Sequence, residues 1–490
     1  MNNIFDKLKA YSDSDYYAFH MPGHKRNLDL MDGTSPYRID ITEIDGFDDL
    51  HHAEGILRDA QERAARVYHA DETHFLVNGS TVGILSAILG TTEKGDSILV
   101  ARNCHKSVYH AIYLNELDPV YLYPKFDTEQ GLSTEIDAAD VQKALEEHPK
   151  IRAVMIVSPT YDGVVSDIEK IAEIVHAKGC PLIVDEAHGA HFGFDPYFPK
   201  SANIYGADLV INSLHKTLPA LTQTALLHVN GDMVKRRKVK QYLDMLQTSS
   251  PSYILMASID ACIGMLEETL ETHSDARSDY KYKNKNIFSE YANRIEALRK
   301  DLKRLKYLKI IQTDNTDRYD RSKFVISVKH APMSSHELYE ILLHRYHLQM
   351  EMLAGTYVLA MTTVGDTQEG LDRLRDALLE IDKEIDTKQG RPAAIETDLP
   401  LSGRQPALEK VWTIAEAVNR RDKIQKRSFE DSIGCISVEY AYLYPPGSPL
   451  IVPGERITKE AVEILHWYQE HDFSIEGLQA EDGIEVWIDG

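Results

Sequence analysis

The chain has 490 residues, 43% hydrophobic and 27% charged, with a formal net charge of −23. This length exceeds what one hydrophobic core usually serves, so we expect two or three domains. The negative charge argues against DNA or RNA as the main partner, because a phosphate backbone requires a basic binding face.

The amino-terminal segment 1–19 carries charges throughout and lacks the apolar core of a secretory signal. No apolar run approaches the roughly 20 residues of a membrane-spanning helix. The cysteines lie far apart and form no CxxC pair, which is typical of reduced thiols and not of a zinc site; they are Cys104, Cys180, Cys262 and Cys435. We therefore expect a soluble, cytoplasmic protein.

Strands and helices alternate between residues 55 and 230. An amphipathic helix is expected first, at 55–70, and a helix at 167–179 ends at Gly179. Short strands rich in Val, Ile and Leu are expected at 96–103, 151–160, 180–188, 207–213 and 224–229. The strand, helix and strand within 151–188 form a βαβ unit, which predicts a parallel sheet covered on both faces.

Polar residues gather where three of these strands end. Residues 158–160, 185–188 and 213–216 each follow an apolar strand. Ligands of open α/β sheets bind outside the carboxyl ends of the strands, so these segments predict a site. A lysine within one of them, Lys216 in "SLHKT", is costly to bury as an ammonium unless its amine is used chemically, as in a Schiff base.

The pattern changes after residue 275. A charged helix at 293–305 leads to a strand at 324–328, a Ser-capped helix at 334–347, a strand at 356–364 and a helix through Ile381. A polar, Pro- and Gly-containing stretch follows and resembles a linker. The predicted division is an N-terminal arm with a large domain at 1–275, a small α+β domain at 276–385, a linker at 386–406 and a C-terminal domain at 407–490.

A basic cluster in "VKRRKVKQYL" (234–243) is most simply a solvated helix face. The letters "VDEAH" (184–188) also occur in some RNA helicases, but the nearest match to a phosphate loop, at 90–97, has Asp96 where a lysine is needed. A metal site from Asp185, His188 and His191 is an alternative, although no further cluster with ligand spacing accompanies it. We predict no metal.

The remaining constellation has the parts of a pyridoxal phosphate site. Lys216 supplies the amine, and Asp185 ends the preceding strand, where its carboxylate could keep a pyridine nitrogen protonated. Ser80 and Thr81 follow Gly79 at the start of a helix, where free N–H groups and hydroxyls bind phosphate. His105 is a flat side chain suited to stacking on the ring. A helix N-cap for Ser80 and a surface position for His105 remain the alternatives.

The sequence also resembles the fold-type-I pyridoxal-phosphate decarboxylases of ornithine, lysine and arginine along nearly its whole length. The matching stretches are "FHMPGHK" (19–25), "DITEIDGFDDLHHAEG" (40–55), "FLVNGST" (75–81), "RNCHKS" (102–107), "SPTYDGV" (158–164), "VDEAHGAH" (184–191), "SLHKTLPALTQ" (213–223) and "YPPGSPLIVPGE" (444–455).

This resemblance implies a role for each matching residue. Lys216 is then the Schiff-base lysine, Asp185 the partner of the pyridine nitrogen and His105 the stacking residue, while the other cofactor neighbours are Ser80, Thr81, His188, Ser213 and His215. The implied fold is α/β, with a fold-type-I large domain built on a parallel-rich sheet, a smaller α+β domain and a C-terminal α+β domain. The implied assembly is a homodimer or a higher homo-oligomer without the N-terminal wing of the large family members.

The implied reaction removes CO2 from a basic amino acid and releases the corresponding diamine or polyamine. Lys216 or His215 would return the proton to Cα. Arginine or lysine is favoured over ornithine by resemblance to the short, wingless members. An aminotransferase-like or other lyase reaction on the same fold remains an alternative, as does a regulator that retains the fold without catalysis.

Recognition of the cationic end of the substrate is the least determined feature. Such a group needs a carboxylate, because an unpaired charge is costly to bury. The candidates are Glu43, Glu439 and Glu455, which lie in or next to matching stretches. We favour Glu439 or Glu455, and a structural carboxylate is the alternative for each.

Overall fold

The computed structural model describes residues 14–20, 23–25, 27, 39–271, 286–311, 316–387, 405–420, 422–444 and 447–488. Residues 21, 22, 445 and 446 of the matching stretches lie outside the described residues, as do residues 1–13 of the expected arm and most of the expected linker.

A seven-stranded sheet forms the centre of the first half of the chain. Its strand order is β2 (Glu72–Leu76), β10 (Ala225–Val229), β9 (Leu209–Asn212), β8 (Leu182–Asp185), β7 (Ile151–Val157), β3 (Ser97–Ala101) and β4 (Asp118–Leu122). The neighbours from β9 to β4 pair in parallel, as the sequence predicts, whereas β10 pairs antiparallel with both β9 and β2. The register sets Asp185 beside Val157 and Ile211, so these strands end at one level.

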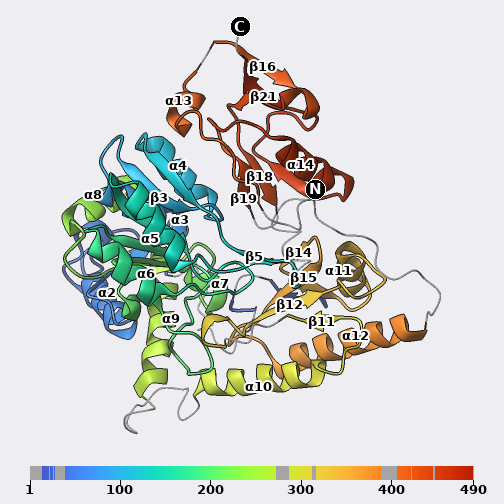
Figure 1. Cartoon of the computed structure of the whole chain (residues 1–490). Coiled ribbons are helices and arrows are strands. Elements are labelled where there is room, and N and C mark those ends of the chain that lie inside the picture. The colour runs from blue at the N-terminus through green and yellow to red at the C-terminus, as the bar shows by residue number, and fades with distance from the viewer. Residues whose placement is uncertain are drawn as a thin grey trace, which may run out of the picture.

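Helices lie on both faces of this sheet, which explains why its central strands β3, β7, β8 and β9 are mostly apolar (Figure 1). They are α2 (Ile56–Val67), α3 (Gly79–Thr91), α4 (Lys106–Leu114), α5 (Ala138–Glu147), α6 (Ile168–Ala177), α7 (Leu214–Thr217), α8 (Arg236–Leu246) and α9 (Tyr253–Glu271), with 3-10 turns at Leu50–His52 and Ala202–Tyr205. At the crossing of α3 and α8, a Cβ on Gly90 would lie 2.6 Å from a methyl of Val239, so glycine permits the close approach.

The basic cluster is part of α8, and its side chains pair with acidic residues of neighbouring elements. Arg236 contacts Asp71 and Glu72, while Lys238 contacts Glu93. These contacts support the expectation of a solvated helix face.

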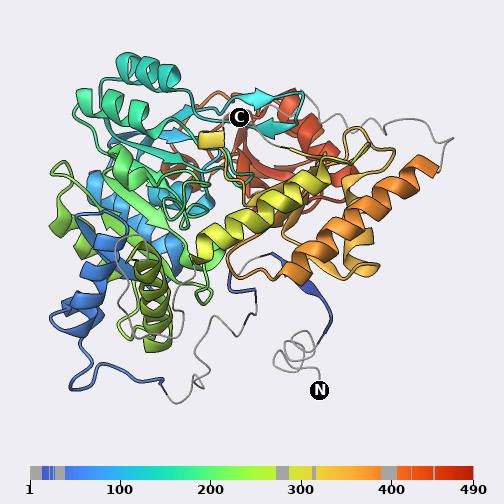
Figure 2. The same ribbon diagram turned by 90° about the horizontal axis from the view of Figure 1, so that it is seen from below.

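A four-stranded antiparallel sheet follows in the order β11 (Lys309–Ile310), β12 (Lys323–Ser327), β15 (Tyr357–Met361) and β14 (Met352–Ala354). The helices around it are α10 (Ile287–Leu302), α11 (Ser335–His344) and α12 (Gln368–Thr387), and a 3-10 turn lies at Thr316–Arg318. Ser334 caps α11 through a reciprocal capping box with Glu337, as its sequence position indicates. The amino-terminal strand β1 (Tyr17–Phe19) pairs with β13 (Leu348–Met350), and α10 and α12 lie side by side (Figure 2).

The last segment forms two three-stranded sheets around α14 (Lys459–Glu470). Their orders are β16 (Ile424–Arg427), β21 (Ile484–Trp487) and β17 (Ile436–Ser437), and β19 (Ser448–Ile451), β18 (Ala441–Tyr444) and β20 (Ser474–Glu476). The same segment contains α13 (Ile414–Val418) and a 3-10 turn at Glu430–Ser432. In the first half of the chain, a hairpin of β5 (Phe126–Asp127) and β6 (Leu132–Ser133) reaches toward the four-stranded sheet (Figure 1). The domain boundaries expected from the sequence stay a prediction.

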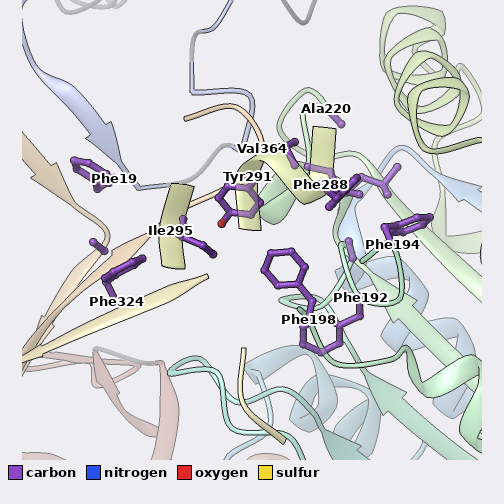
Figure 3. Close-up of a cluster of buried hydrophobic side chains, with 14 of the residues drawn as sticks. Phe19, Phe192, Phe194, Phe198, Ala220, Phe288, Tyr291, Ile295, Phe324 and Val364 are labelled. Atoms are coloured by element: carbon purple, nitrogen blue, oxygen red, sulfur yellow. The ribbon is translucent and has the colours of Figure 1, made fainter. Parts of the chain in front are cut away.

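An aromatic cluster joins the seven-stranded and four-stranded sheets through α10 (Figure 3). Phe194 stacks on Phe288 with ring centroids 5.5 Å apart, and Phe198 stacks on Tyr291 at the same separation. Phe324 of β12 belongs to the same buried core. The two sheets therefore share one core, which fixes how their facing edges meet.

The cysteines are free thiols, three of them buried. Across the described ranges, no helix combines the length and the apolar character that a membrane crossing requires.

Candidate functional site

A cavity of about 450 Å³ lies at the carboxyl ends of β7, β8 and β9. Its wall includes every residue that the sequence predicts for the cofactor, namely Ser80, Thr81, His105, Asp185, His188, Ser213, His215 and Lys216. The four-stranded sheet contributes residues 354–357, and the C-terminal segment contributes residues 405, 443, 447, 448, 450, 464 and 468. Parts of the chain that are distant in sequence thus enclose one space.

Lys216 lies on the short helix α7, directly after β9. Its Nζ atom is 3.1 Å from Nε2 of His188. Burial lowers the pKa of the Lys216 amine, and the carboxyl of Asp185 opposes that shift. The position therefore shifts the equilibrium toward the neutral amine, the form of lysine that can act as a nucleophile.

Asp185 is the last residue of β8 and is 4% exposed. Burial raises the pKa of its carboxyl, and the positive charge of Lys216 and the backbone N–H of Ala187 oppose this. A cation bound in the cavity beside Asp185 would therefore gain strongly from its charge and would hold the carboxyl ionised.

The start of helix α3 forms one end of the cavity. Gly79 has a φ of +74°, a conformation that glycine adopts at little cost, and turns the chain into the helix. The hydroxyl oxygens of Ser80 and Ser213 lie 2.5 Å apart, and Thr81 is exposed beside them. Backbone N–H groups of a first helical turn and clustered hydroxyls together bind an anion such as phosphate.

Two histidines complete the same wall. His105 caps α4 by accepting the N–H of Ser107 at its Nδ1. Its ring is accessible from the cavity although protein surrounds most of it, and desolvation and the charge of Lys216 lower its pKa to about 4. The Nδ1 atom of His215 lies 2.9 Å from the carbonyl oxygen of Thr224, and burial lowers the pKa of the His215 imidazole.

The cavity wall also contains residues that the sequence did not single out. The hydroxyl of Tyr357 donates to Asp162 Oδ1 at 2.5 Å, and burial raises the pKa of Asp162 to about 6. Tyr161 donates its hydroxyl to Glu351. Tyr161 and Asp162 lie within the matching stretch "SPTYDGV", which could have indicated them, whereas nothing in the sequence distinguishes Tyr357.

The alternative metal site is not assembled. His191 Nε2 lies 3.0 Å from Asp320 Oδ1, on another element, while His188 contacts two lysines. Throughout the part of the chain that the structure describes, His, Cys, Asp and Glu side chains form no group of three suited to a metal ion.

Within one chain, the carboxylates suggested for the cationic end of the substrate lie outside the cavity wall. Glu455 is fully buried, and Arg102 donates to its Oε2 at 2.9 Å. Glu439 accepts the backbone N–H groups of Gln479 and Glu485, and Glu43 is exposed. None of the three belongs to the cavity wall. Their role toward substrate stays a prediction that the geometry of one chain does not support.

Glu455→Gln should lower the free energy of unfolding by about 3–5 kcal/mol, because it leaves Arg102 buried without its counter-charge. The measurement is urea unfolding followed by circular dichroism. The double variant Arg102→Met/Glu455→Leu is the control and should lose less, since no charge is left alone. Normal stability together with a raised KM in the single variant would instead support contact with substrate.

Two family models match this chain. The model described as "Orn/Lys/Arg decarboxylase, major domain" matches residues 2–333, and the model for the C-terminal domain of that family matches residues 404–486. A Bacillus subtilis (strain 168) protein named "Uncharacterized protein YaaO" is 36% identical over 94% of this chain and 93% of its own length. The arginine decarboxylase of the same organism is 30% identical over 94% of this chain and 92% of its own length.

Among solved structures, the lysine decarboxylase LdcF of Francisella novicida superposes with a TM-score of 0.77 at 18% identity, covering 98% of this chain and 80% of that one. This likeness confirms the expected fold class, an α/β fold of the fold-type-I pyridoxal-phosphate enzymes.

Proposed function

Since the chain belongs to the Orn/Lys/Arg decarboxylase family and is an amino-acid decarboxylase, we propose that its cavity holds pyridoxal 5'-phosphate at Lys216 and acts on arginine. The observation that carries this proposal is the position of Lys216 and Asp185. Lys216 follows β9, Asp185 ends the neighbouring parallel strand β8, and both line one cavity with the first residues of α3.

The residues present fit this cofactor at its aldehyde, its ring nitrogen and its phosphate. The amine of Lys216 would hold the aldehyde carbon, and the carboxylate of Asp185 would pair with the protonated ring nitrogen. The first turn of α3 with Ser80 and Ser213 would hold the phosphate. The bound cofactor supplies an electron sink for the pair of electrons that CO2 leaves behind.

The chain's own groups orient the reactants and move the proton. Asp185 would keep a proton on the ring nitrogen of the bound cofactor, because its buried negative charge would stabilise the neighbouring positive charge. His105, in the cavity wall, would stack on the ring, as the family resemblance implies. Lys216 or His215, both in the cavity wall, would return a proton to the substrate Cα after CO2 leaves.

Arginine is favoured as substrate because the arginine decarboxylase of Bacillus subtilis matches nearly the whole chain, whereas the lysine decarboxylase LdcA of Pseudomonas aeruginosa matches 54% of it. The product would be the corresponding amine, an entry to polyamine synthesis in the cytoplasm. Among the residues that the structure describes, the carboxylates in the cavity wall are Asp185 and Asp162.

We also propose a homodimer. Large apolar side chains are exposed before and at the start of α2 and on α8, at Ile44, Phe47, Ile56 and Met245. Phe47 and Met245 are brought to one region, because Tyr253 donates to the carbonyl of Phe47 and His51 contacts Asp244. An exposed apolar group of this kind is typical of a protein interface.

The substrate is tested by incubating the holoenzyme with arginine, lysine or ornithine and measuring CO2 and amine. We expect turnover of arginine above that of lysine, and of lysine above that of ornithine. Preference for lysine would correct the substrate while leaving the reaction intact. A keto acid in place of CO2 would instead indicate an aminotransferase reaction.

Lys216→Ala should abolish turnover, because it removes the amine that binds the cofactor and carries the proton. In the parent protein, borohydride should reduce a cofactor bond onto the peptide containing residue 216, detected by mass spectrometry. Lys106→Ala, which removes an exposed lysine next to His105, is the control and should keep that bond. Parental turnover by Lys216→Ala would show that the assignment is wrong.

Asp185→Asn should lower kcat about a thousandfold. A charge pair at about 4 Å and an effective dielectric near 20 is coupled by about 4 kcal/mol, and about 1.4 kcal/mol changes a rate tenfold. Glu186→Gln is the matched control, since this neighbouring buried carboxylate accepts from Ser201 and from the Ala202 N–H and does not line the cavity. Equal losses in both variants would indicate a structural effect only.

A further inference from the structure

A second lysine is buried behind the cavity and has no part in the proposed chemistry. Lys323 is the first residue of β12, is 0% exposed and does not belong to the cavity wall. Its Nζ atom lies 3.4 Å from Nδ1 of His188, and the other ring nitrogen, Nε2, lies 3.1 Å from Nζ of Lys216. The imidazole therefore lies between two lysine nitrogens. Lys216 is on α7, which follows β9 of the seven-stranded sheet, and Lys323 is on β12 of the four-stranded sheet.

The surroundings of His188 favour the neutral form of its imidazole. Burial and the charges of Lys216, Lys323, His105 and His215 all lower its pKa well below the usual value. The ring also packs against Tyr161, with centroids 4.4 Å apart. A neutral imidazole has one N–H donor and one acceptor nitrogen.

Counting donors shows that the two lysines cannot both be ammonium ions and both be bonded to a neutral imidazole. An ammonium group only donates, so a neutral imidazole accepts from one ammonium at most. The lysine at the other ring nitrogen must accept the N–H, which requires a neutral amine.

The surrounding charges decide which lysine keeps its proton. The groups that act on Lys323 are Asp320, Glu351, Asp162, Lys25 and Lys216. Asp320 stays ionised, because His191 and the N–H of Ser322 lower its pKa to about 2, and it lies beside Lys323. Burial lowers the pKa of Lys323 only to about 8. The groups that raise the pKa of Lys216 are Glu351 and Asp185, and burial raises the pKa of Asp185 itself.

We propose that Lys323 is a positioning residue, whose ammonium donates to Nδ1 of His188, fixes the Nε2–H tautomer and thereby holds Lys216 as a neutral amine. The use of that amine for cofactor binding rests on the proposed function, but its protonation state does not. Because β12 belongs to the four-stranded sheet, the packing of that sheet against the seven-stranded one controls the reactivity of Lys216.

The test measures the titration of Lys216 in the cofactor-free, full-length protein. Competitive acetylation with acetic anhydride at graded pH, quantified by peptide mass spectrometry, gives the apparent pKa of the Lys216 amine. Lys323→Met should raise it by about one unit or more, which lowers acetylation of Lys216 about tenfold at any pH below both pKa values. Lys323→Arg keeps a cationic donor and should restore the parental profile.

Two controls separate a relay through His188 from a general effect of charge. Lys25→Met removes another buried lysine, whose Nζ donates to the carbonyl oxygens of His20 and Met361 at 2.8 Å, and should leave the profile of Lys216 unchanged. In a His188→Phe background, Lys323→Met should shift the pKa of Lys216 far less than in the parent. Near-ultraviolet circular dichroism checks that each variant is folded.

An unchanged pKa of Lys216 in folded Lys323→Met overturns the proposal, as does an equal shift with and without His188. If Lys323→Met does not fold, the parent still decides, because a Lys216 that titrates near the ordinary lysine value of about 10.4 also overturns it. If borohydride treatment of the parent holoenzyme attaches no cofactor to the peptide containing residue 216, the proposed function is contradicted, but the proposal for Lys323 is not.

Discussion

The arrangement of this protein depends on keeping the amine of Lys216 in a place where an ammonium ion is unfavourable. Burial lowers its pKa, and the carboxyl of Asp185, which opposes this shift, is itself buried. A neutral amine is the reactive form of lysine, so the desolvation that makes this position costly also makes it useful. The apolar strand β9 positions Lys216 there, because α7, which carries Lys216, begins at the carboxyl end of β9.

That environment exists only where the two larger sheets meet. The core that contains Phe194, Phe288 and Phe324 is shared by both, so neither sheet can shift without losing packed apolar surface. The same junction sets His188, from the segment after β8, against Lys323 of β12. Packing and electrostatics are thereby coupled: the contacts that stabilise the junction also position the charges around the reactive amine.

The C-terminal segment is attached by a different interaction. Arg102, which follows β3, is fully buried and donates both to the carboxylate of Glu455 and to the carbonyl of Leu450. Its guanidinium also lies over the rings of Tyr109 and Tyr121. A buried pair of this kind contributes geometric specificity more than net stability, because its desolvation is costly. It holds β19, and with it residues 448 and 450 of the cavity wall, against the seven-stranded sheet.

Most local elements, and the cofactor residues that line the cavity, could be predicted from the amino-acid sequence. Apolar runs, the Ser334 cap and Gly179 specify strands and helix ends through neighbouring residues, and parallel pairing then brings the ends of β7, β8 and β9 to one edge. The partner of each buried charge, in contrast, is seen only in the folded chain. Glu455 pairs with Arg102, Tyr357 with Asp162 and Lys323 with His188, and each pair joins distant segments. Strand and helix patterns depend on near neighbours, whereas the group that faces a buried charge depends on how whole elements pack.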